Sequence, residues 1–424
     1  MKHKTSLMKL SALILSSALL LFAVGCSGSS EKKRTSKSES TPESSAASVR
    51  SESSLWVPTS SAPPSQVSVE EEKSIYPSEW DDNGIFSAYY EKAYKLVRDM
   101  PLDEKLGQMI YVEPPEKFGG DYARKYHLGG YIMFGKDFAG KIQADVKENI
   151  RNYLYSQSIP MTISVDEEGG DVTRISGKPA LYDHEFQSPR ALYKKGGMEL
   201  IKKDAVEKAK MLSDYGIDVN LAPVCDICTN PKEFMYSRSL GEDAKTTAEF
   251  VKTVTEASQE NGVSVTLKHF PGYGGNADTH TGVAVDKREM KEFEENDFLP
   301  FKAGIDAGAH LVMVSHNIVN CMDSERPASL SPEVHKLLRE KLGFTGIIIT
   351  DDLSMQAISK YSGENTPAVA AILAGNDMLI ISSDMLEVSL QSVKKAIEDG
   401  TIDEKTIDHA VTRILAWKYS KNMM

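Results

Sequence analysis

The sequence predicts a single (β/α)8 TIM-type barrel, preceded by a signal peptide and a disordered tether. Two observations support this prediction. Eight short apolar runs alternate with amphipathic helical patterns over residues 75–424, as expected for buried parallel strands joined by helices. Chemically active side chains directly follow several of these runs, and the strands of a parallel barrel all end on one face.

The predicted elements follow one another without a visible domain boundary. Strands are predicted at residues 106–112, 129–134, 159–165, 217–221, 263–267, 309–314, 346–350 and 377–381. Helices are predicted at residues 143–155, 199–214, 246–260, 291–307, 332–341, 367–373, 386–398 and 407–419. A doubly wound sheet is the alternative, but no glycine fingerprint opens a strand-to-helix turn as a dinucleotide site requires. The pattern therefore favours one barrel.

The N-terminus has the features of an export signal. Three lysines precede an apolar run at residues 10–24, which is short for a bilayer span and ends at Gly25-Cys26. This stretch resembles a bacterial lipoprotein signal, so residues 1–25 are expected to be removed and Cys26 to become the lipidated first residue. An uncleaved membrane anchor is the alternative. Both interpretations predict an extracytoplasmic protein held at the cell membrane.

Residues 26–74 differ in composition from the rest of the chain. They are rich in Ser, Glu, Lys and Pro and contain few large apolar side chains. Such a segment buries too little apolar surface to offset the entropy lost on ordering. We therefore expect a disordered linker, followed by the barrel at residues 75–424.

Charge and cysteine content exclude several classes of function. Removal of residues 1–25 takes away three lysines and no acid, which changes the net charge from −12 to −15. A chain this acidic is a poor candidate for binding nucleic acid. Cys225 and Cys228 lack a thioredoxin-like context and a second pair at zinc-finger spacing, so buried thiols are expected. No metal and no organic cofactor is implied.

Carboxylates and imidazoles recur where the predicted strands end. The segments concerned are Asp166-Glu167-Glu168, Lys268-His269, Ser315-His316-Asn317 and Asp351-Asp352. A glycine-bounded loop after the fifth strand carries Asp278 and His280, a spacing that allows a carboxylate to orient an imidazole for proton transfer. Any one acid could simply cap the next helix. Several acids on one rim instead point to glycosidic bond cleavage, which requires paired acidic groups.

Five ordered segments resemble glycoside hydrolase family 3. Residues 337–355 resemble its nucleophile signature, and residues 268–280 resemble the catalytic loop of its β-N-acetylglucosaminidase branch. Residues 102–109, 166–174 and 238–243 also match in order and spacing, so the likeness covers nearly all of residues 85–420. Tyr273 stands where the family more often has His, and Leu240 replaces a common Phe. Both departures concern the leaving-group side of the site.

The resemblance implies a role for each matching residue. Asp351 corresponds to the nucleophile, His280 to the general acid/base and Asp278 to the residue that orients the imidazole. The residues implied to hold the hydroxyls of the terminal sugar are Asp166, Arg174, Arg238, Lys268 and His269. Asp352 is left out of the catalytic set.

The expected activity is that of a retaining exo-β-N-acetylglucosaminidase. Its substrate partner would be a carbohydrate, either a cell-wall fragment or a chitin-type oligosaccharide. A β-glucosidase or glycoside phosphorylase on the same barrel is one alternative. A non-catalytic sugar-binding lipoprotein is another, although the joint presence of Asp351, Asp278 and His280 argues against it.

Overall fold

Eight parallel strands form the central sheet in the computed structural model, which describes residues 74–275, 284–354, 358, 360–363 and 365–424. The strands are β1 (Ile110–Val112), β2 (Gly130–Met133), β3 (Thr162–Val165), β4 (Val219–Asn220), β5 (Ser264–Phe270), β7 (Leu311–Val314), β9 (Ile347–Thr350) and β10 (Leu379–Ile381). Their order is β10-β1-β2-β3-β4-β5-β7-β9, and a parallel bridge between Ile349 and Met378 closes the barrel. The predicted fold class is confirmed.

The strand predictions hold because these residues are apolar and covered on both sides of the sheet. Every residue in the eight strands is buried, which is why their sequences are apolar runs rather than alternating patterns. Seven strands fall inside the predicted ranges. β5 extends three residues further, to Phe270, and so carries Lys268 and His269 on the strand itself.

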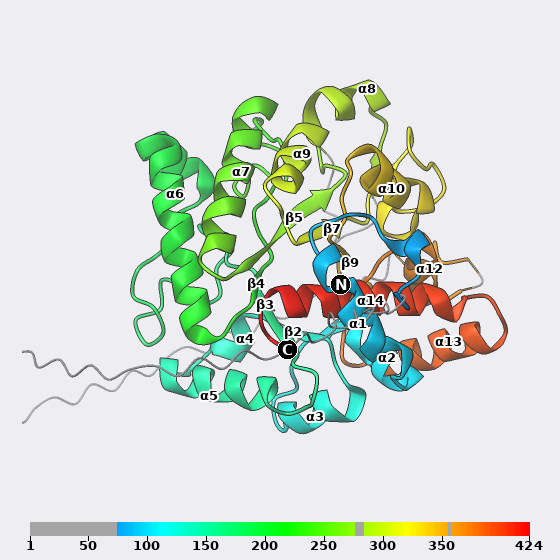
Figure 1. Ribbon diagram of the computed structural model, residues 1–424. Coiled ribbons are helices and arrows are strands. Elements are labelled where there is room, and N and C mark those ends of the chain that lie inside the picture. The colour runs from blue at the N-terminus through cyan, green and yellow to red at the C-terminus, as the bar shows by residue number, and fades with distance from the viewer. Residues whose placement is uncertain (1–73, 276–283, 355–357, 359, 364) are drawn as a thin grey trace, which may run out of the picture. The chain divides into compact units, whose positions relative to one another are not determined.

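Helices alternate with the strands and surround the barrel (Figure 1). They are α3 (Gly119–Tyr126), α4 (Gly135–Phe138), α5 (Gln143–Leu154), α6 (Pro189–Tyr215), α7 (Ala244–Glu260), α8 (Met290–Glu292), η3 (Phe293–Asp297), α9 (Phe298–Asp306), η4 (Ala328–Leu330), α10 (Pro332–Lys336), η5 (Leu337–Lys341), α12 (Pro367–Ala374) and α13 (Leu386–Glu398). Before β1 come η1 (Ser78–Trp80), α1 (Ser87–Arg98) and α2 (Leu102–Gln108), and α14 (Glu404–Ser420) ends the chain. A small sheet pairs β6 (Val285–Asp286) with β8 (Ile318–Val319).

Several helices differ from the prediction. α3 and α4 were not predicted, and residues 106–108, predicted as the start of a strand, are the last turn of α2. α6 comprises two helical segments that meet at a kink, because Gly196 and Gly197 have non-helical backbone angles; the helix predicted at residues 199–214 is its second segment, and the first was not predicted. Its start is specified by Ser188, whose side chain accepts a hydrogen bond from the Ala191 amide. α1 was not predicted, although its buried residues Tyr90, Ala93 and Val97 have helical spacing.

α14 covers the end of the barrel where the strands begin. Its Trp417 indole donates to Ser264 Oγ (3.3 Å), and the Lys418 ammonium donates to Gln108 Oε1 (2.6 Å). Both partners lie at or just before the first residue of a strand. α1 packs against α14 on the outside (Figure 1). The opposite end, where the strands finish, is therefore the one at which side chains can meet a ligand.

The N-terminal predictions fall outside the described residues, which exclude residues 1–73. These are the signal peptide, Cys26 and all but the last residue of the linker. In the described part of the chain, no helix is both long and apolar enough to cross a membrane.

Candidate active site

The carboxyl ends of β3, β5 and β9 bring the predicted site residues together. Asp166 follows β3, Lys268 and His269 belong to β5, and Asp351 follows β9. Lys268 Nζ lies 2.7 Å from Asp166 Oδ1, which joins two strands that are not adjacent in the sheet. Lys268 also contributes to the electrostatic environment of Asp351. We use the name strand-end cluster for the five side chains that are joined by ion pairs here, which are Asp166, Glu168, Arg174, Arg238 and Lys268.

Glu168 is a central member of the cluster that was noted as a rim acid but not assigned a role. Its Oε1 lies 2.8 Å from Lys268 Nζ. The Arg238 guanidinium donates a hydrogen bond to each oxygen of Glu168, from Nε to Oε2 (2.9 Å) and from Nη2 to Oε1 (2.6 Å). Arg174 Nη2 lies 3.3 Å from Asp166 Oδ2 on the other side. Two carboxylates and three cations are thus interlocked.

The buried members of the cluster remain charged because they neutralise one another. Burial would raise the pKa of Glu168, but Lys268 and Arg238 hold it well below its usual range. Burial would lower the pKa of Lys268, and Asp166 and Glu168 raise it instead. Among the described residues, the Lys268 ammonium uses two of its three donors in these ion pairs.

His269 is oriented by Asp226, a residue that the sequence reasoning missed. His269 Nδ1 lies 2.7 Å from Asp226 Oδ2, and the Tyr273 amide donates to Asp226 Oδ1 (2.7 Å). Asp226 is buried, so these contacts fix both the imidazole and the start of the following loop. The sequence signal for Asp226 is an acid shortly after β4, between Cys225 and Cys228.

Asp351 is half-buried, and among the described residues its carboxylate accepts one backbone hydrogen bond. Its Oδ1 accepts a hydrogen bond from the Asp352 amide (2.8 Å). Burial would raise its pKa, but His316, His269, that amide and Lys268 together lower it. His316 is held in turn by the Asp352 carbonyl, 2.9 Å from its Nε2. Among the residues that the structure describes, no Lys or Arg side chain forms a salt bridge with Asp351.

The short loop that supplies Arg174 is fixed by Glu167. Its buried carboxylate accepts hydrogen bonds from the backbone amides of Arg174 (2.8 Å) and Ile175 (2.9 Å). The Asn220 side chain accepts from the Glu167 amide (3.0 Å), which ties the loop to β4. Glu167 therefore positions Arg174 relative to Asp166.

Two predicted catalytic residues, Asp278 and His280, lie outside the described residues. The described chain stops at Gly275 and resumes at Ala284, whose carbonyl accepts a hydrogen bond from the Ile318 amide (2.9 Å). Gly275 and Ala284 lie at the same end of the barrel as the strand-end cluster, because Gly275 follows β5 and Ala284 contacts β8.

The cysteines behave as predicted. Cys225 and Cys228 are free and buried, and burial raises the pKa of both thiols, that of Cys228 to about 12. Within the described ranges, no group of three His, Cys, Asp or Glu side chains is arranged to hold a metal ion.

A closed parallel barrel with charged, hydrogen-bonding groups gathered at its strand ends defines a class of barrel enzymes that act on polar substrates. The family is shown by comparison. Residues 101–417 match the Glycosyl hydrolase family 3 N terminal domain, and the chain belongs to this family of glycoside hydrolases.

Individual relatives agree with this assignment. A beta-hexosaminidase from Xanthomonas campestris pv. campestris is 32% identical over 280 residues, covering 64% of this chain and 83% of the relative. A solved glycoside hydrolase family 3 beta-N-acetylglucosaminidase from Paenibacillus sp. is 31% identical with a TM-score of 0.70, and the match covers 76% of this chain and 63% of that one. The solved beta-N-acetylhexosaminidase from Beutenbergia cavernae is 26% identical with a TM-score of 0.66, over 76% and 99% of the two chains.

Proposed function

We propose that the protein is a retaining exo-β-N-acetylglucosaminidase that removes terminal β-linked N-acetylhexosamine from cell-wall or chitin-type oligosaccharides. The observation that carries the proposal is the position of Asp351 directly after β9, at the same end of the barrel as the ion-paired Asp166 and Lys268. The printed activities of the relatives support the choice of an N-acetylated sugar.

In the proposed first step, Asp351 attacks the anomeric carbon. Oδ1 already accepts the Asp352 amide, so Oδ2 is the oxygen left to form the ester. The bond from the anomeric carbon to the departing oxygen breaks, and that oxygen takes a proton from His280. In the second step, water gives a proton to His280 and attacks the same carbon, which releases Asp351 and retains the configuration. Asp278 would orient His280 in both steps.

We assign the recognition of the terminal sugar to Asp166, Arg174, Arg238, Lys268 and His269. These side chains are already held by one another, so little conformational entropy would be lost when hydroxyl groups replace water. Asp166 and Arg238 each keep a small exposed fraction, 14% and 17%, which leaves them reachable by a ligand. The carbohydrate partner thus meets a rigid, charged surface.

A fluorinated N-acetylglucosamine-type inactivator tests the reaction and the nucleophile together. Mass spectrometry of the inactivated protein is expected to find the label on Asp351. Label on another residue would overturn the assignment.

Two further assays separate the alternative activities. Turnover of nitrophenyl glucoside in preference to nitrophenyl N-acetylglucosaminide would favour a β-glucosidase, and sugar 1-phosphate formed in phosphate buffer would favour a phosphorylase.

We also propose that the mature protein is anchored outside the cytoplasm through a lipid on Cys26, with residues 26–74 as a tether. The lysine-flanked apolar run that ends at Gly25-Cys26 supports this. Metabolic labelling with a clickable fatty acid is expected to mark the wild-type protein and to leave Cys26→Ala unlabelled. Equal labelling of both proteins would contradict the proposal.

A further inference from the structure

One arginine side chain joins the two described ends that flank residues 276–283. Arg288 Nη2 donates to the Gly272 carbonyl (3.3 Å), shortly before this segment, and to Asp286 Oδ2 (2.8 Å), shortly after it. Arg288 Nη1 donates to Asp297 Oδ2 (2.7 Å), which belongs to η3. We use the name loop-stem network for Gly272, Asp286, Arg288 and Asp297.

The guanidinium of Arg288 is held in one orientation. Its Nε donates to Asp286 Oδ2 (3.0 Å) beside the Nη2 contact, and the guanidinium carbon lies 4.2 Å from the centre of the Phe293 ring. Only 3% of the side chains of Asp286 and Asp297 is exposed, so little water competes for these bonds. Burial raises the pKa of Asp297 to about 6, although Arg288 lowers it, so Asp297 is ionised at neutral pH.

The chain that follows β5 lies directly against this network. Gly272 and Gly274 have positive φ angles of 122° and 57°. A Cβ at residue 272 would collide with Asp297 Oδ1, and a Cβ at residue 274 would come within 2.6 Å of Arg288 Nη2. Glycine at both positions therefore allows the backbone to approach the ion pairs closely.

The same stretch is tied to the sugar-binding side chains from its other side. The Tyr273 amide donates to Asp226 Oδ1 (2.7 Å), and Asp226 Oδ2 lies 2.7 Å from His269 Nδ1. His269 Nε2 lies 3.4 Å from Arg238 Nη2. Because Gly272 and Tyr273 are adjacent, the position of this backbone depends on both the loop-stem network and the residues assigned to the terminal sugar.

Stability alone does not account for the loop-stem network. Burying two carboxylates with an arginine costs desolvation free energy that their attraction only partly returns, and apolar side chains of similar size often stabilise a fold as well or better. What the network supplies is a fixed separation between the backbone before residue 276 and the backbone after residue 283, because both are bonded to one planar group.

We propose that Arg288 is a positioning residue for proton transfer to the leaving group. By fixing both ends of residues 276–283, it sets where His280 and Asp278 stand relative to Asp351. This inference rests on the proposed function, in which His280 protonates the departing oxygen. Replacing Arg288 therefore weakens acid catalysis more than it weakens nucleophilic attack by Asp351.

The test uses two substrates that differ only in the leaving group. Dinitrophenolate departs from 2,4-dinitrophenyl N-acetylglucosaminide without a proton, whereas phenol departs slowly from phenyl N-acetylglucosaminide unless its oxygen is protonated. The quantity measured is kcat/KM for the dinitrophenyl substrate divided by kcat/KM for the phenyl substrate, on the full-length protein in detergent. We expect this ratio to rise about tenfold in Arg288→Lys, because general acid catalysis contributes about 10²–10⁴-fold and part of it is lost. A purely structural defect would lower both values equally.

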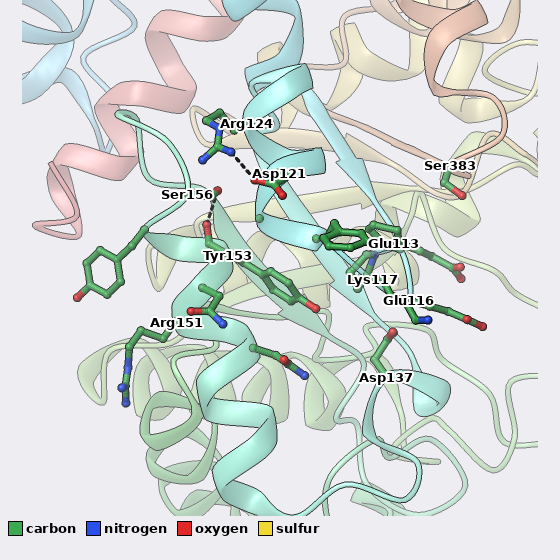
Figure 2. A pocket seen from close by; sticks show the side chains of 18 of the residues that line it. Glu113, Glu116, Lys117, Asp121, Arg124, Asp137, Arg151, Tyr153, Ser156 and Ser383 are labelled. Carbon is green, nitrogen blue, oxygen red and sulfur yellow. Dashed lines mark hydrogen bonds and ion pairs between the residues drawn. The ribbon is translucent and has the colours of Figure 1, made fainter.

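Two control variants leave the loop-stem network intact. Arg413→Lys weakens a buried ion pair with Asp377 at the opposite end of the barrel, so it controls for lost stability. Arg124→Lys alters an exposed ion pair with Asp121 on α3, at the hollow drawn in Figure 2, which no residue of the loop-stem network lines. Both controls should leave the ratio unchanged.

A double variant shows whether Arg288 acts through His280. His280→Ala should raise the ratio by itself, and Arg288→Lys added to it should raise the ratio no further. A further rise would overturn the inference, because Arg288 would then act by another route. If His280→Ala leaves the ratio unchanged, the assignment of the acid/base fails and the inference fails with it.

Asp297→Asn decides the inference if Arg288→Lys does not fold. It keeps the shape of the side chain and weakens one anchor of the guanidinium, so the ratio should rise by a smaller factor. An unchanged ratio in the folded variant would overturn the inference and leave the proposed function intact. If the wild type hydrolyses neither glycoside, the proposed function and the inference are both overturned.

Discussion

The two ends of the barrel both contain buried ion pairs, but they use them differently. Where the strands begin, Asp377 lies between Arg413 Nη1 and Arg339 Nη2, each 2.6 Å away, and also accepts the Ile348 amide (2.7 Å). Burial would raise the pKa of Asp377, and the two arginines lower it. All its partners are internal, and only 3% of its side chain is exposed.

Where the strands finish, Asp351 lies outside the ion pairs that the described residues form. Those ion pairs join Lys268, Arg174 and Arg238 to Asp166 and Glu168, whereas Asp351 accepts the Asp352 amide. A carboxylate held by two arginines, like Asp377, would be a poor nucleophile because its charge is already neutralised. Under the proposed function, the ion pairs at the Asp377 end stabilise the fold, and the end that holds Asp351 carries out the reaction.

The largest expected effect comes from removing the nucleophile. Asp351→Asn should lower kcat by a factor on the order of 10⁴ or more, as removal of an attacking group does in other enzymes. Steady-state hydrolysis of nitrophenyl N-acetylglucosaminide measures this. Because the lowered pKa of Asp351 means that its charge stabilises the fold, the unfolding temperature of the variant should fall slightly, with the variant still folded. Loss of folding together with activity would contradict the proposed division between the two ends.

Removing the central carboxylate at the other end should have the opposite outcome. Asp377→Ala leaves Arg339 and Arg413 buried without their partner, which should cost about 3–5 kcal/mol of unfolding free energy. Urea denaturation followed by circular dichroism measures the loss. At a temperature where the variant is still folded, its kcat should be within about twofold of the wild type. A selective fall in kcat would mean that this network also shapes the site.

A smaller effect on activity is expected when the Arg238 guanidinium, which forms a bidentate contact with Glu168, is replaced. Arg238→Lys keeps the charge but loses the two-pronged contact, so kcat/KM should fall about 10- to 100-fold. Arg98→Lys, which alters an exposed Arg–Asp pair on α1, is the matched control and should change nothing measurable. Equal behaviour of the two variants would show that the geometry at Arg238 is unimportant.

The mildest test changes only the pH. Because the pKa of Asp351 is lowered in the folded protein, the nucleophile stays ionised at and below the usual aspartate pKa and is lost only as the pH falls through its folded value. The rate of labelling by the fluorinated inactivator should therefore show its acid limb below the usual aspartate range. If the acid limb that is due to Asp351 lies above that range, burial raises the pKa of Asp351 by more than His316, His269 and Lys268 lower it.

Local patterns predicted much of the site. The apolar runs located all eight strands, and the residues directly after β3 and β9, Asp166 and Asp351, were predicted because such positions share one face of any parallel barrel. α7 begins at Ala244, two residues before the predicted start, because the Asp243 side chain caps it by accepting a hydrogen bond from the Thr246 amide.

Asp226 and Glu167 could not be assigned in this way, because their roles depend on partners distant in the sequence. Asp226 acts through His269, which lies 43 residues away, and Glu167 acts through its hold on the loop of Arg174. The sequence alone determined the alternation of strands and helices and the acids that follow the strands. The reason is that hydrophobic periodicity is a local property of the chain. Which acid is neutralised and which imidazole is oriented were decided only by tertiary structure, because electrostatic effects depend on distances in space.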